Sequence, residues 1–325
     1  MAKVLITGGS GFIGTNLVEL HRKKGDEILN LDWQPVRNPE HEGHWKNLDV
    51  LDREKFVEAV KNFQPDVFYH LAARTDIDGK TLDEYKTNTD GVRNAVLAAK
   101  TCENLQRFVV ASSQLVCRVG YYPKDEFDYA PPNAYGESKV MTEKIVREEA
   151  EGLPWVLIRP TTIWGDWFGV KYQGLYRTVR RNRYIHPKGM KINKVWGYVG
   201  NSVFCLDKLA TADESRVKGK VFFLADYEAY DLLDYAQRIE KAWGAPPIKE
   251  VPLILLKSIA KFGDLMKAMG RNFPLHSYRL SNFLAQMQAD LKPLEEVCGP
   301  LPYSLDQSVA NTVAWIKAHE DFDRD

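Results

Sequence analysis

The stretch TGGSGFIG, from Thr7 to Gly14, follows the apolar run Val4 to Ile6 directly and decides the fold. A strand that ends in a glycine turn and opens a helix presents free backbone N–H groups and the positive end of the helix dipole to a pyrophosphate. Gly8 would form the tight turn, Gly11 would let the phosphates approach, and Gly14 would let the helix pack closely on the strand. The stretch therefore predicts a dinucleotide site.

An acidic residue stands at the spacing expected for contact with a ribose. Asp32 closes a second apolar run, Ile28 to Leu31. Its carboxylate would accept hydrogen bonds from the adenosine ribose hydroxyls and repel a 2′-phosphate, which favours NAD as the cofactor. Arg37 is close enough in sequence to keep NADP as the alternative.

Alternating apolar runs and helical patterns place this turn in a larger α/β fold. We expect strands at Lys3 to Thr7, Glu27 to Asp32, Asp66 to His70, Arg107 to Ala111 and Trp155 to Arg159. The helices between them are expected at Phe12 to Lys24, Arg53 to Asn62, Glu84 to Cys102 and Ala134 to Glu151. This order predicts a Rossmann-type, doubly wound parallel sheet.

The regular alternation of expected strands and helices ends after Pro160, which predicts a smaller mixed C-terminal lobe. We expect an NAD-binding domain with the catalytic residues over 1–165 and a substrate-binding lobe over 166–325. Segments at about 195–225 would return to the main sheet, with a strand at Lys220 to Leu224. Helices are expected from Leu232 to Trp243 and from Ser308 to Ala318.

The overall composition excludes several classes of partner. The 325 residues carry 44 basic and 44 acidic side chains, so no overall field would recruit nucleic acid. His41 and His44 lie three apart, but no carboxylate or second pair completes a metal site, and we expect no metal. The cysteines have neither zinc-site spacing nor disulfide density, at Cys102, Cys117, Cys205 and Cys298.

The chain carries no pattern of a secreted or membrane-spanning protein. Strand-like sequence follows Met1 at once, which leaves no room for a signal peptide, and we expect a cytoplasmic protein. The most apolar segment, Val251 to Gly270, is interrupted by Lys257, Lys261 and Lys267. A basic amphipathic helix can lie on a membrane, yet such a stripe more often packs against its own protein, so we expect no membrane contact.

A tyrosine and a lysine open the helix that follows the fourth strand. Tyr135 and Lys139 are four residues apart, so they share one helix face. An ammonium at roughly 4 Å contributes about 4 kcal/mol toward a phenolate at an effective dielectric of ~20. That is about three pKa units, which would let Tyr135 exchange a proton near neutral pH. Ser113 ends the preceding strand, at the edge where ligands bind in such sheets.

These motifs resemble the extended short-chain dehydrogenase/reductases, in particular their NAD-dependent epimerase/dehydratase branch, clearly to about Gly165 and diffusely beyond it. The resemblance implies that Ser113 hydrogen-bonds the reacting oxygen and Tyr135 is the general acid/base. Lys139 would lower the pKa of the phenol and bind the nicotinamide ribose, and Asp49 would contact adenine. The residues expected at the cofactor are Gly8, Gly11, Phe12, Ile13, Gly14, Asp32, Asp49, Val50, Leu71, Ala72, Ala73, Asn88, Tyr135, Lys139 and Pro160.

The resemblance also implies a small-molecule substrate, a nucleotide diphosphate sugar oxidised at a carbinol carbon through a keto-sugar. Gln114 and Leu115 stand where dehydratases of the family carry an acidic pair, which argues against elimination of water. Basic residues follow the sheet, and arginines near aromatics can clamp a diphosphate or simply be solvated. The residues expected at the substrate are Gln114, Thr162, Arg177 and Lys194.

Two other functions remain open from the sequence. The first is an NAD(P)-dependent dehydrogenase of a sterol-like or other apolar alcohol, since the 3β-hydroxysteroid branch has the same motifs. The second is a non-catalytic dinucleotide-sensing protein, although Ser113, Tyr135 and Lys139 are all retained. Members of the family commonly pair through helices such as 84–102 and 134–151, so we expect a homodimer.

Overall fold

The protein is described by a computed structural model that covers residues 1–169, 173–271 and 273–319. The chain forms two compact units. The first comprises Met1–Phe168, Gly197–Tyr227 and Asp290–Tyr303, and the second comprises Gly169–Trp196, Glu228–Ala289 and Ser304–Asp325. That one part of the chain serves the cofactor and the other the substrate stays a prediction.

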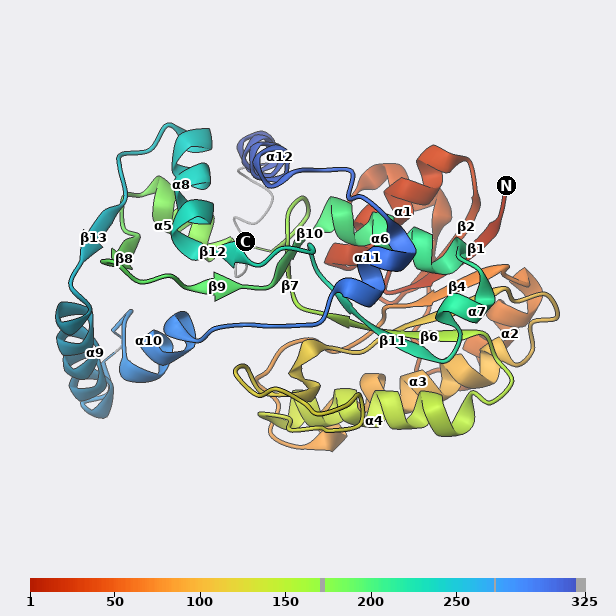
Figure 1. The fold of residues 1–325 in the computed structure, drawn as a ribbon. Helices are drawn as coiled ribbons and strands as arrows, with labels where there is room; N and C mark the ends of the chain where they lie inside the picture. Colours follow the sequence, from red (N-terminus) through yellow and green to blue (C-terminus); the bar gives the residue numbers. More distant parts are fainter. Residues whose placement is uncertain (170–172, 272, 320–325) are drawn as a thin grey trace. The chain divides into compact units, whose positions relative to one another are not determined.

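A seven-stranded parallel sheet forms the centre of the first unit (Figure 1). Its strand order is β11-β6-β5-β4-β1-β2-β3, and each neighbouring pair is parallel. The strands are β1 (Lys3–Thr7), β2 (Glu27–Asp32), β3 (Trp45–Asn47), β4 (Val67–His70), β5 (Arg107–Ala111), β6 (Trp155–Pro160) and β11 (Lys220–Leu224). The direction of winding reverses between β1 and β4, which is where such sheets bind ligands.

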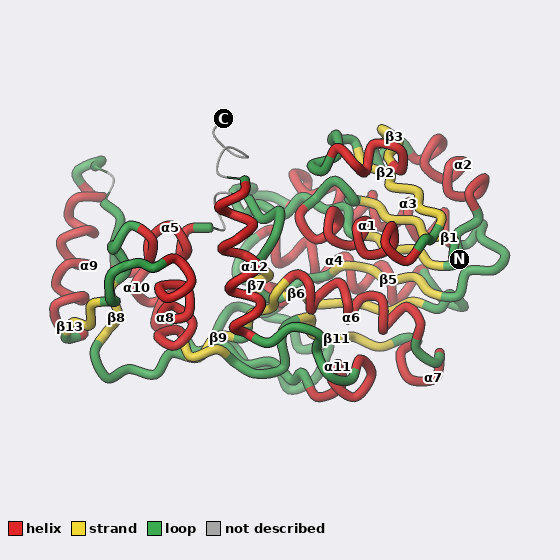
Figure 2. The backbone as a smooth tube through the Cα atoms, turned by 90° about the horizontal axis from the view of Figure 1, so that it is seen from above, coloured by secondary structure: helices red, strands yellow, loops and turns green. Residues whose placement is uncertain are grey.

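Helices cover both faces of this sheet, as Figures 1 and 2 show. One face carries α2 (Arg53–Phe63), α3 (Lys86–Ala99) and α4 (Ala134–Glu149), which pack side by side. The other carries α1 (Phe12–Lys24) and α6 (Val199–Thr211), with α7 (Glu214–Val217) and α11 (Lys292–Cys298). The predicted Rossmann-type, doubly wound α/β fold is confirmed.

The middles of the central strands β1, β4, β5 and β6 are mainly apolar because helices bury them from both sides. Leu5, Phe68, Phe108 and Leu157 come from four neighbouring strands and are fully buried in one core. The rings of Phe68 and Phe108 lie 4.9 Å apart between centroids. This continuous core holds the carboxyl ends of the strands in a fixed row.

The structure differs from the sequence prediction in two local features of the first unit. The short edge strand β3 was not expected, because Lys46 and Asn47 are exposed polar residues without an apolar alternation. The single helix predicted at 84–102 is a 3₁₀ turn, η2 (Leu82–Tyr85), followed by α3. Thr81 and Glu84 form a capping box that starts the 3₁₀ turn.

The second unit is built from short strands and helices. Two small sheets pair β9 (Asn193–Lys194) with β12 (Tyr230–Asp231), and β8 (Ile185–Pro187) with β13 (Lys249–Val251). The helices are α5 (Gly174–Arg180), α8 (Leu232–Trp243), α9 (Leu253–Ala268), α10 (Ser277–Leu284) and α12 (Leu305–Ala318). In the described ranges no helix has the length and apolar character needed to cross a bilayer.

Candidate active site

In the turn after β1, Gly8 and Gly14 have no room for a side chain. Gly8 has φ +74°, and a Cβ there would lie 2.7 Å from the amide nitrogen of Ala72. A Cβ on Gly14 would lie 2.1 Å from the carbonyl oxygen of Gly8. These two glycines let the turn, the first residues of α1 and the loop after β4 approach one another.

Gly9, which the sequence prediction did not include among the functional glycines of the turn, is also required by the fold. A Cβ on Gly9 would lie 2.3 Å from the Asn30 side-chain oxygen. Asn30 is fully buried on β2 and donates to the Ser10 hydroxyl at 3.3 Å. A polar residue inside the apolar run that ends at Asp32 is the signal that could have revealed this support.

The first turn of α1 fits an anion. Gly11 is the N-cap residue, so no side chain caps the helix, and the first turn contains no acidic residue. A Cβ on Gly11 would be 3.1 Å from the Gly8 carbonyl oxygen, a tight contact that glycine avoids. The amide groups of Phe12 and Ile13, at the positive end of the helix, are where a pyrophosphate would bind.

Asp32 lies at the carboxyl end of β2 beside this turn. Its Oδ2 accepts from the Ser10 amide at 3.0 Å, and its Oδ1 accepts from the Gln34 amide at 2.9 Å. Burial raises the pKa of Asp32, and these backbone donors act in the opposite direction. Arg37 donates to the carbonyl oxygens of Ser10 and Trp167 at 3.0 and 2.9 Å. The carboxylate is thus fixed next to the turn, and the guanidinium is tied to the backbone.

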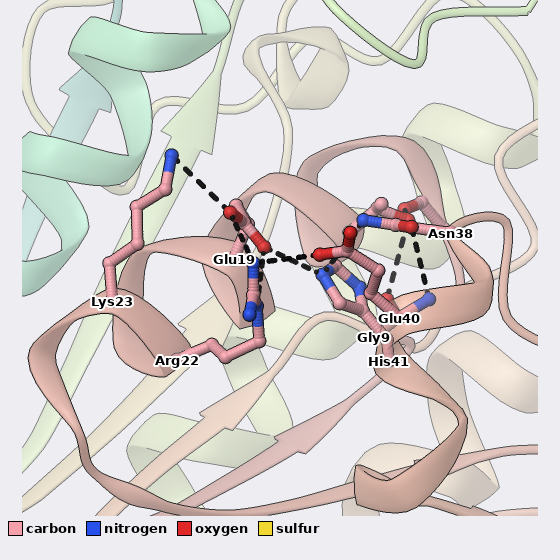
Figure 3. Close-up of polar contacts among 9 residues, drawn as sticks. Gly9, Glu19, Arg22, Lys23, Asn38, Glu40 and His41 are labelled. Carbon is pink, nitrogen blue, oxygen red and sulfur yellow. Dashed lines mark hydrogen bonds and ion pairs between the residues drawn. The ribbon is translucent and has the colours of Figure 1, made fainter.

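The segment after Asp32 is anchored to α1 by a cluster of charged side chains, shown in Figure 3. Glu19 accepts from Arg22 at 2.9 Å, contacts Lys23 at 3.3 Å and lies 3.0 Å from the ring nitrogen of His41. Burial alone would raise the pKa of Glu19, but these partners lower it to about 2. The cluster holds the 3₁₀ turn η1 (Pro39–His44) against α1.

The predicted cofactor loop after β4 is held from both sides. The Leu71 amide donates to the Thr7 carbonyl at 3.0 Å, and the Ala72 amide donates to the Thr7 hydroxyl at 3.4 Å. His70 lies 2.8 Å from the same hydroxyl, and its burial lowers its pKa to about 3, so the ring is neutral. Ala73 follows in this loop, half-buried.

Asn88 fixes the end of the same loop. It is fully buried on α3, where its side chain accepts from the Arg74 amide at 2.8 Å and donates to the Arg74 carbonyl at 3.0 Å. Its amide also donates to Ser138 on α4 at 2.9 Å. Val50, after β3, is buried and its carbonyl accepts from Asn94 at 2.9 Å, while the Asp49 carboxylate accepts from the exposed Leu51 amide.

The elements that carry the expected catalytic residues, η3 (Gln114–Val116) and the first turns of α4, pack together at the carboxyl end of β5. Ser113 caps the 3₁₀ turn η3, and its Oγ accepts from the Leu115 amide at 3.1 Å. A Cβ on Gly136 would lie 2.4 Å from the Leu115 carbonyl oxygen. The glycine therefore lets the first turn of α4, which carries Tyr135, lie against the turn that carries Ser113.

Lys139 lies one helical turn after Tyr135 and points into the same region. Its Nζ donates to the carbonyl oxygen of Ala111, the last residue of β5, at 2.8 Å. Burial lowers the pKa of Lys139 to about 8, and the charge of Glu143 opposes this shift. The side chain is still mainly a cation at neutral pH. The buried ammonium of Lys139 is thus hydrogen-bonded to Ala111, which precedes Ser113 by two residues in the chain. Lys139 also shares one face of α4 with Tyr135.

A buried ion pair lies one helical turn after Lys139 on α4, and the sequence prediction did not include this pair. Glu143, a further turn along α4, pairs with Arg159 of β6 through two hydrogen bonds of 2.8 Å. It also accepts from the Ser112 hydroxyl at 2.6 Å and the Tyr129 hydroxyl at 2.9 Å. The four-residue spacing from Lys139 was a visible signal, but nothing in the sequence pairs Glu143 with Arg159.

The residues expected at the substrate lie in both units. In the first unit, Gln114 is half-buried in η3, and Thr162 is exposed at the start of β7 (Thr162–Trp164), which pairs with β10 (Trp196–Tyr198). Pro160, which was expected at the cofactor, ends β6 two residues before Thr162. In the second unit, Arg177 donates to the Gln173 side chain at 3.1 Å.

Lys194 is also in the second unit, where it is buried. Its Nζ donates to the carbonyl oxygens of Asn282 and Ala285 at 3.1 and 2.6 Å, at the end of α10. Burial lowers its pKa to about 8. These contacts give Lys194 a role in holding α10. Among the residues that the structure describes, no group of three His, Cys, Asp or Glu side chains could hold a metal ion.

Comparison with known proteins shows the same fold and related activities. The sequence model of the NAD dependent epimerase/dehydratase family matches residues 4–225. The chain is 27% identical over 264 residues to a 3-beta-hydroxysteroid dehydrogenase of Mycolicibacterium neoaurum, covering 75% of this chain and 71% of that one. It is also 27% identical over 333 residues to the N-acetyl-alpha-D-glucosaminyl-diphospho-ditrans,octacis-undecaprenol 4-epimerase of Escherichia coli O157:H7, covering 97% and 96%.

The fold of a solved structure is also similar over almost the full length. It is the UDP-glucuronic acid 4-epimerase of Bacillus cereus, crystallised with NAD, with a TM-score of 0.71 and 19% identity. The alignment covers 97% of this chain and 99% of that one. At this identity the likeness shows a shared architecture.

Proposed function

The chain belongs to the NAD dependent epimerase/dehydratase family, and we propose that it epimerises or oxidises a nucleotide-activated sugar at a carbinol carbon. The protein is an NAD-dependent enzyme of the extended short-chain dehydrogenase/reductase type. The observation that carries the proposal is the buried cation of Lys139, which lies on α4 one turn after Tyr135 and donates a hydrogen bond to Ala111 at the end of β5, two residues before Ser113. This arrangement suits proton exchange with an alcohol oxygen.

The proposed chemistry follows from the three side chains. The hydroxyl of Ser113 hydrogen-bonds the substrate oxygen, and Tyr135, as a phenolate, accepts the proton of the carbinol hydroxyl. Lys139 stabilises that phenolate, because a cation nearby in a site of low dielectric lowers the pKa of a phenol. When bound, NAD supplies the hydride acceptor, on the cradle formed by Gly8, Gly11 and Gly14.

Tyr135 then returns its proton to the oxygen of the keto-sugar in the reverse step. If the sugar has turned in the pocket, the product is the epimer. If the reduced cofactor leaves, the product is the oxidised sugar. The same three residues serve both outcomes, so the balance between them depends on the groups that hold the sugar. Our candidates are Gln114 and Thr162 in the first unit and, separately, Arg177 in the second.

A sugar linked through a diphosphate is supported by the relative from Escherichia coli, whose name includes a glucosaminyl-diphospho group and which aligns with the chain over 96% of its own length. A second candidate is an apolar alcohol, supported by the 3-beta-hydroxysteroid dehydrogenase that matches three quarters of the chain. The same Ser113, Tyr135 and Lys139 would act on either alcohol.

The experiment that separates these candidates is a substrate panel. Purified protein is incubated with NAD and UDP-hexoses, a polyprenyl-diphospho sugar or a 3β-hydroxysteroid, and NADH absorbance and product stereochemistry are followed together. A sugar epimer without NADH identifies an epimerase, and stoichiometric NADH with an oxidised sugar identifies a dehydrogenase. Turnover of the steroid alone would overturn the sugar proposal.

We also infer a homodimer and a cytoplasmic location. The helices α3 and α4 lie together on one face of the sheet, as expected for a pairing surface of this family. The cysteines at 102, 117, 205 and 298 are free, which suits a reducing compartment. Light scattering on the purified protein tests the dimer, and cell fractionation tests the location.

A further inference from the structure

Helix α9 of the second unit is apolar on two sides, and only one of them is covered. Figure 2 shows α9 beside α10, where Leu256 and Ala260 pack against Leu280. The opposite side is exposed, by 76% at Ile254, 48% at Leu255, 52% at Phe262, 57% at Leu265 and 57% at Met269. The sequence expectation that this stripe packs within the protein therefore holds for one side of α9 alone.

The exposed apolar side chains share one face of α9, on which the exposed Ser258 lies between Ile254 and Phe262 and donates its hydroxyl to the Ile254 carbonyl oxygen at 3.0 Å. Phe262, Leu265 and Met269 follow Ile254 by eight, eleven and fifteen residues, which places all four on one helix face. Tyr278 of α10 is exposed as well. Scattered apolar side chains are ordinary on a protein surface, whereas a contiguous apolar stripe marks an interaction site.

Basic side chains border this stripe. Lys257 and Lys261 lie three and seven residues after Ile254, and both are exposed. From Val251 to Ala289 the sequence has five basic residues and one acidic residue, Asp264. The Asp264 carboxylate accepts from the Ser277 amide at 3.0 Å, at the start of α10, so it is engaged within the protein. The stripe is thus complementary to an apolar surface that carries negative charge.

We propose that this stripe, formed by Ile254, Leu255, Phe262, Leu265 and Met269 and bordered by Lys257 and Lys261, docks on the surface of a membrane rich in anionic lipid. The helix has 16 residues, fewer than the ~20 that span a bilayer, and its lysines exclude the hydrocarbon core. An amphipathic helix of this kind lies in the plane of the interface, with its apolar face among the acyl chains and its lysines at the headgroups.

Vesicle sedimentation tests the proposal without any use of turnover. The full-length protein is mixed with vesicles of phosphatidylcholine alone or of equal parts phosphatidylcholine and phosphatidylglycerol. We expect binding to the anionic vesicles that weakens at high salt and on phosphatidylcholine alone. Lys257→Ala with Lys261→Ala should reduce the partition coefficient by about 25-fold, since each lysine near an anionic surface contributes about fivefold.

The apolar contribution is tested by Phe262→Glu with Leu265→Glu, which should reduce binding by more than about tenfold. Both side chains are more than half exposed; Phe262→Glu removes a ring contact with Phe273, but Leu256, Ala260 and Leu280 still hold the helix on α10. Phe127→Glu is the matched control, because Phe127 is 59% exposed in the first unit and should not alter binding. Circular dichroism of each variant shows that it is folded.

Two results would overturn the proposal. One is that wild-type protein does not sediment with anionic vesicles, or that the α9 variants bind as well as wild type. The other is that Phe262→Glu with Leu265→Glu converts a dimer to a monomer in light scattering while vesicle binding is absent. That outcome would make the stripe a contact between two copies of the chain.

Discussion

Glu143 of α4 and Arg159 of β6 form a fully buried ion pair through two hydrogen bonds of 2.8 Å. The carboxylate also accepts from Ser112, the neighbour of Ser113, and follows Lys139 by one helical turn. One buried pair therefore ties together the strand end and the helix that carry the candidate catalytic residues.

Removal of the Glu143 charge should destabilise the first unit strongly. In Glu143→Gln the Arg159 guanidinium keeps its charge in a buried place without a carboxylate, which costs about 3–5 kcal/mol of unfolding free energy. Urea denaturation of wild type and Glu143→Gln measures this loss of unfolding free energy. The control is Glu296→Gln, which breaks the exposed pair with Lys292 on α11 and should change stability by less than about 1 kcal/mol. Equal effects of the two substitutions would contradict a buried, interdependent pair.

Lys139→Met should abolish turnover and yet stabilise the protein at neutral pH. Burial lowers the pKa of Lys139 from its ordinary value of 10.5 to about 8 in the folded chain, so the unfolded state holds more protons between these values. Stability therefore rises with pH across this window, and below pH 8 the buried cation costs up to about 3 kcal/mol. The variant should lack this slope.

The measurement is the free energy of unfolding of wild type and Lys139→Met from pH 7 to pH 9.5, together with turnover. Wild type and variant should converge as the pH rises. Lys61→Met, on the exposed side of α2, is the control and should change stability by no more than about 0.5 kcal/mol. A wild type that is more stable than Lys139→Met at pH 7 would contradict the desolvation cost.

Asp32→Asn should weaken the preference for NAD over NADP. The carboxylate repels a 2′-phosphate, whereas the amide keeps an oxygen that can accept from Ser10 and so preserves the turn. We expect the ratio of the two dissociation constants, measured by calorimetry, to fall by about tenfold or more, a change of roughly 1.4 kcal/mol. Asp49→Asn is the control, because adenine is common to both cofactors. An unchanged ratio in Asp32→Asn would remove Asp32 from cofactor discrimination.

The local patterns of the sequence predict the fold well, because the periodicity and the turn residues that define each βαβ unit lie close together in the chain. The glycine turn is followed by α1 exactly where the periodicity of Phe12 to Lys24 places it. The strands β1, β2 and β5 also begin and end where the apolar runs do. The edge strand β3 could not be foreseen, since it is three residues long and depends on its pairing with β2.

The supports of the candidate site are harder to predict, because they join residues far apart in the chain. Glu143 reaches Arg159 only after α4 has packed on the sheet beside β6, and Gly9 is required by Asn30 of the next strand. Lys194 lies in a basic, aromatic-rich stretch of sequence, which predicted a substrate contact. In the fold its ammonium instead donates to the Ala285 carbonyl at the end of α10. The roles of the polar side chains thus depend on tertiary packing.

The central claim is that Tyr135 exchanges the proton of the substrate hydroxyl, and turnover of Tyr135→Phe tests it most directly. The substitution removes one oxygen and leaves the ring beside Tyr85, at 6.0 Å between centroids. With NAD and the substrate identified in the panel, we predict a loss of roughly 10² to 10⁴-fold in turnover, with NAD affinity retained. Turnover equal to that of wild type would contradict the account.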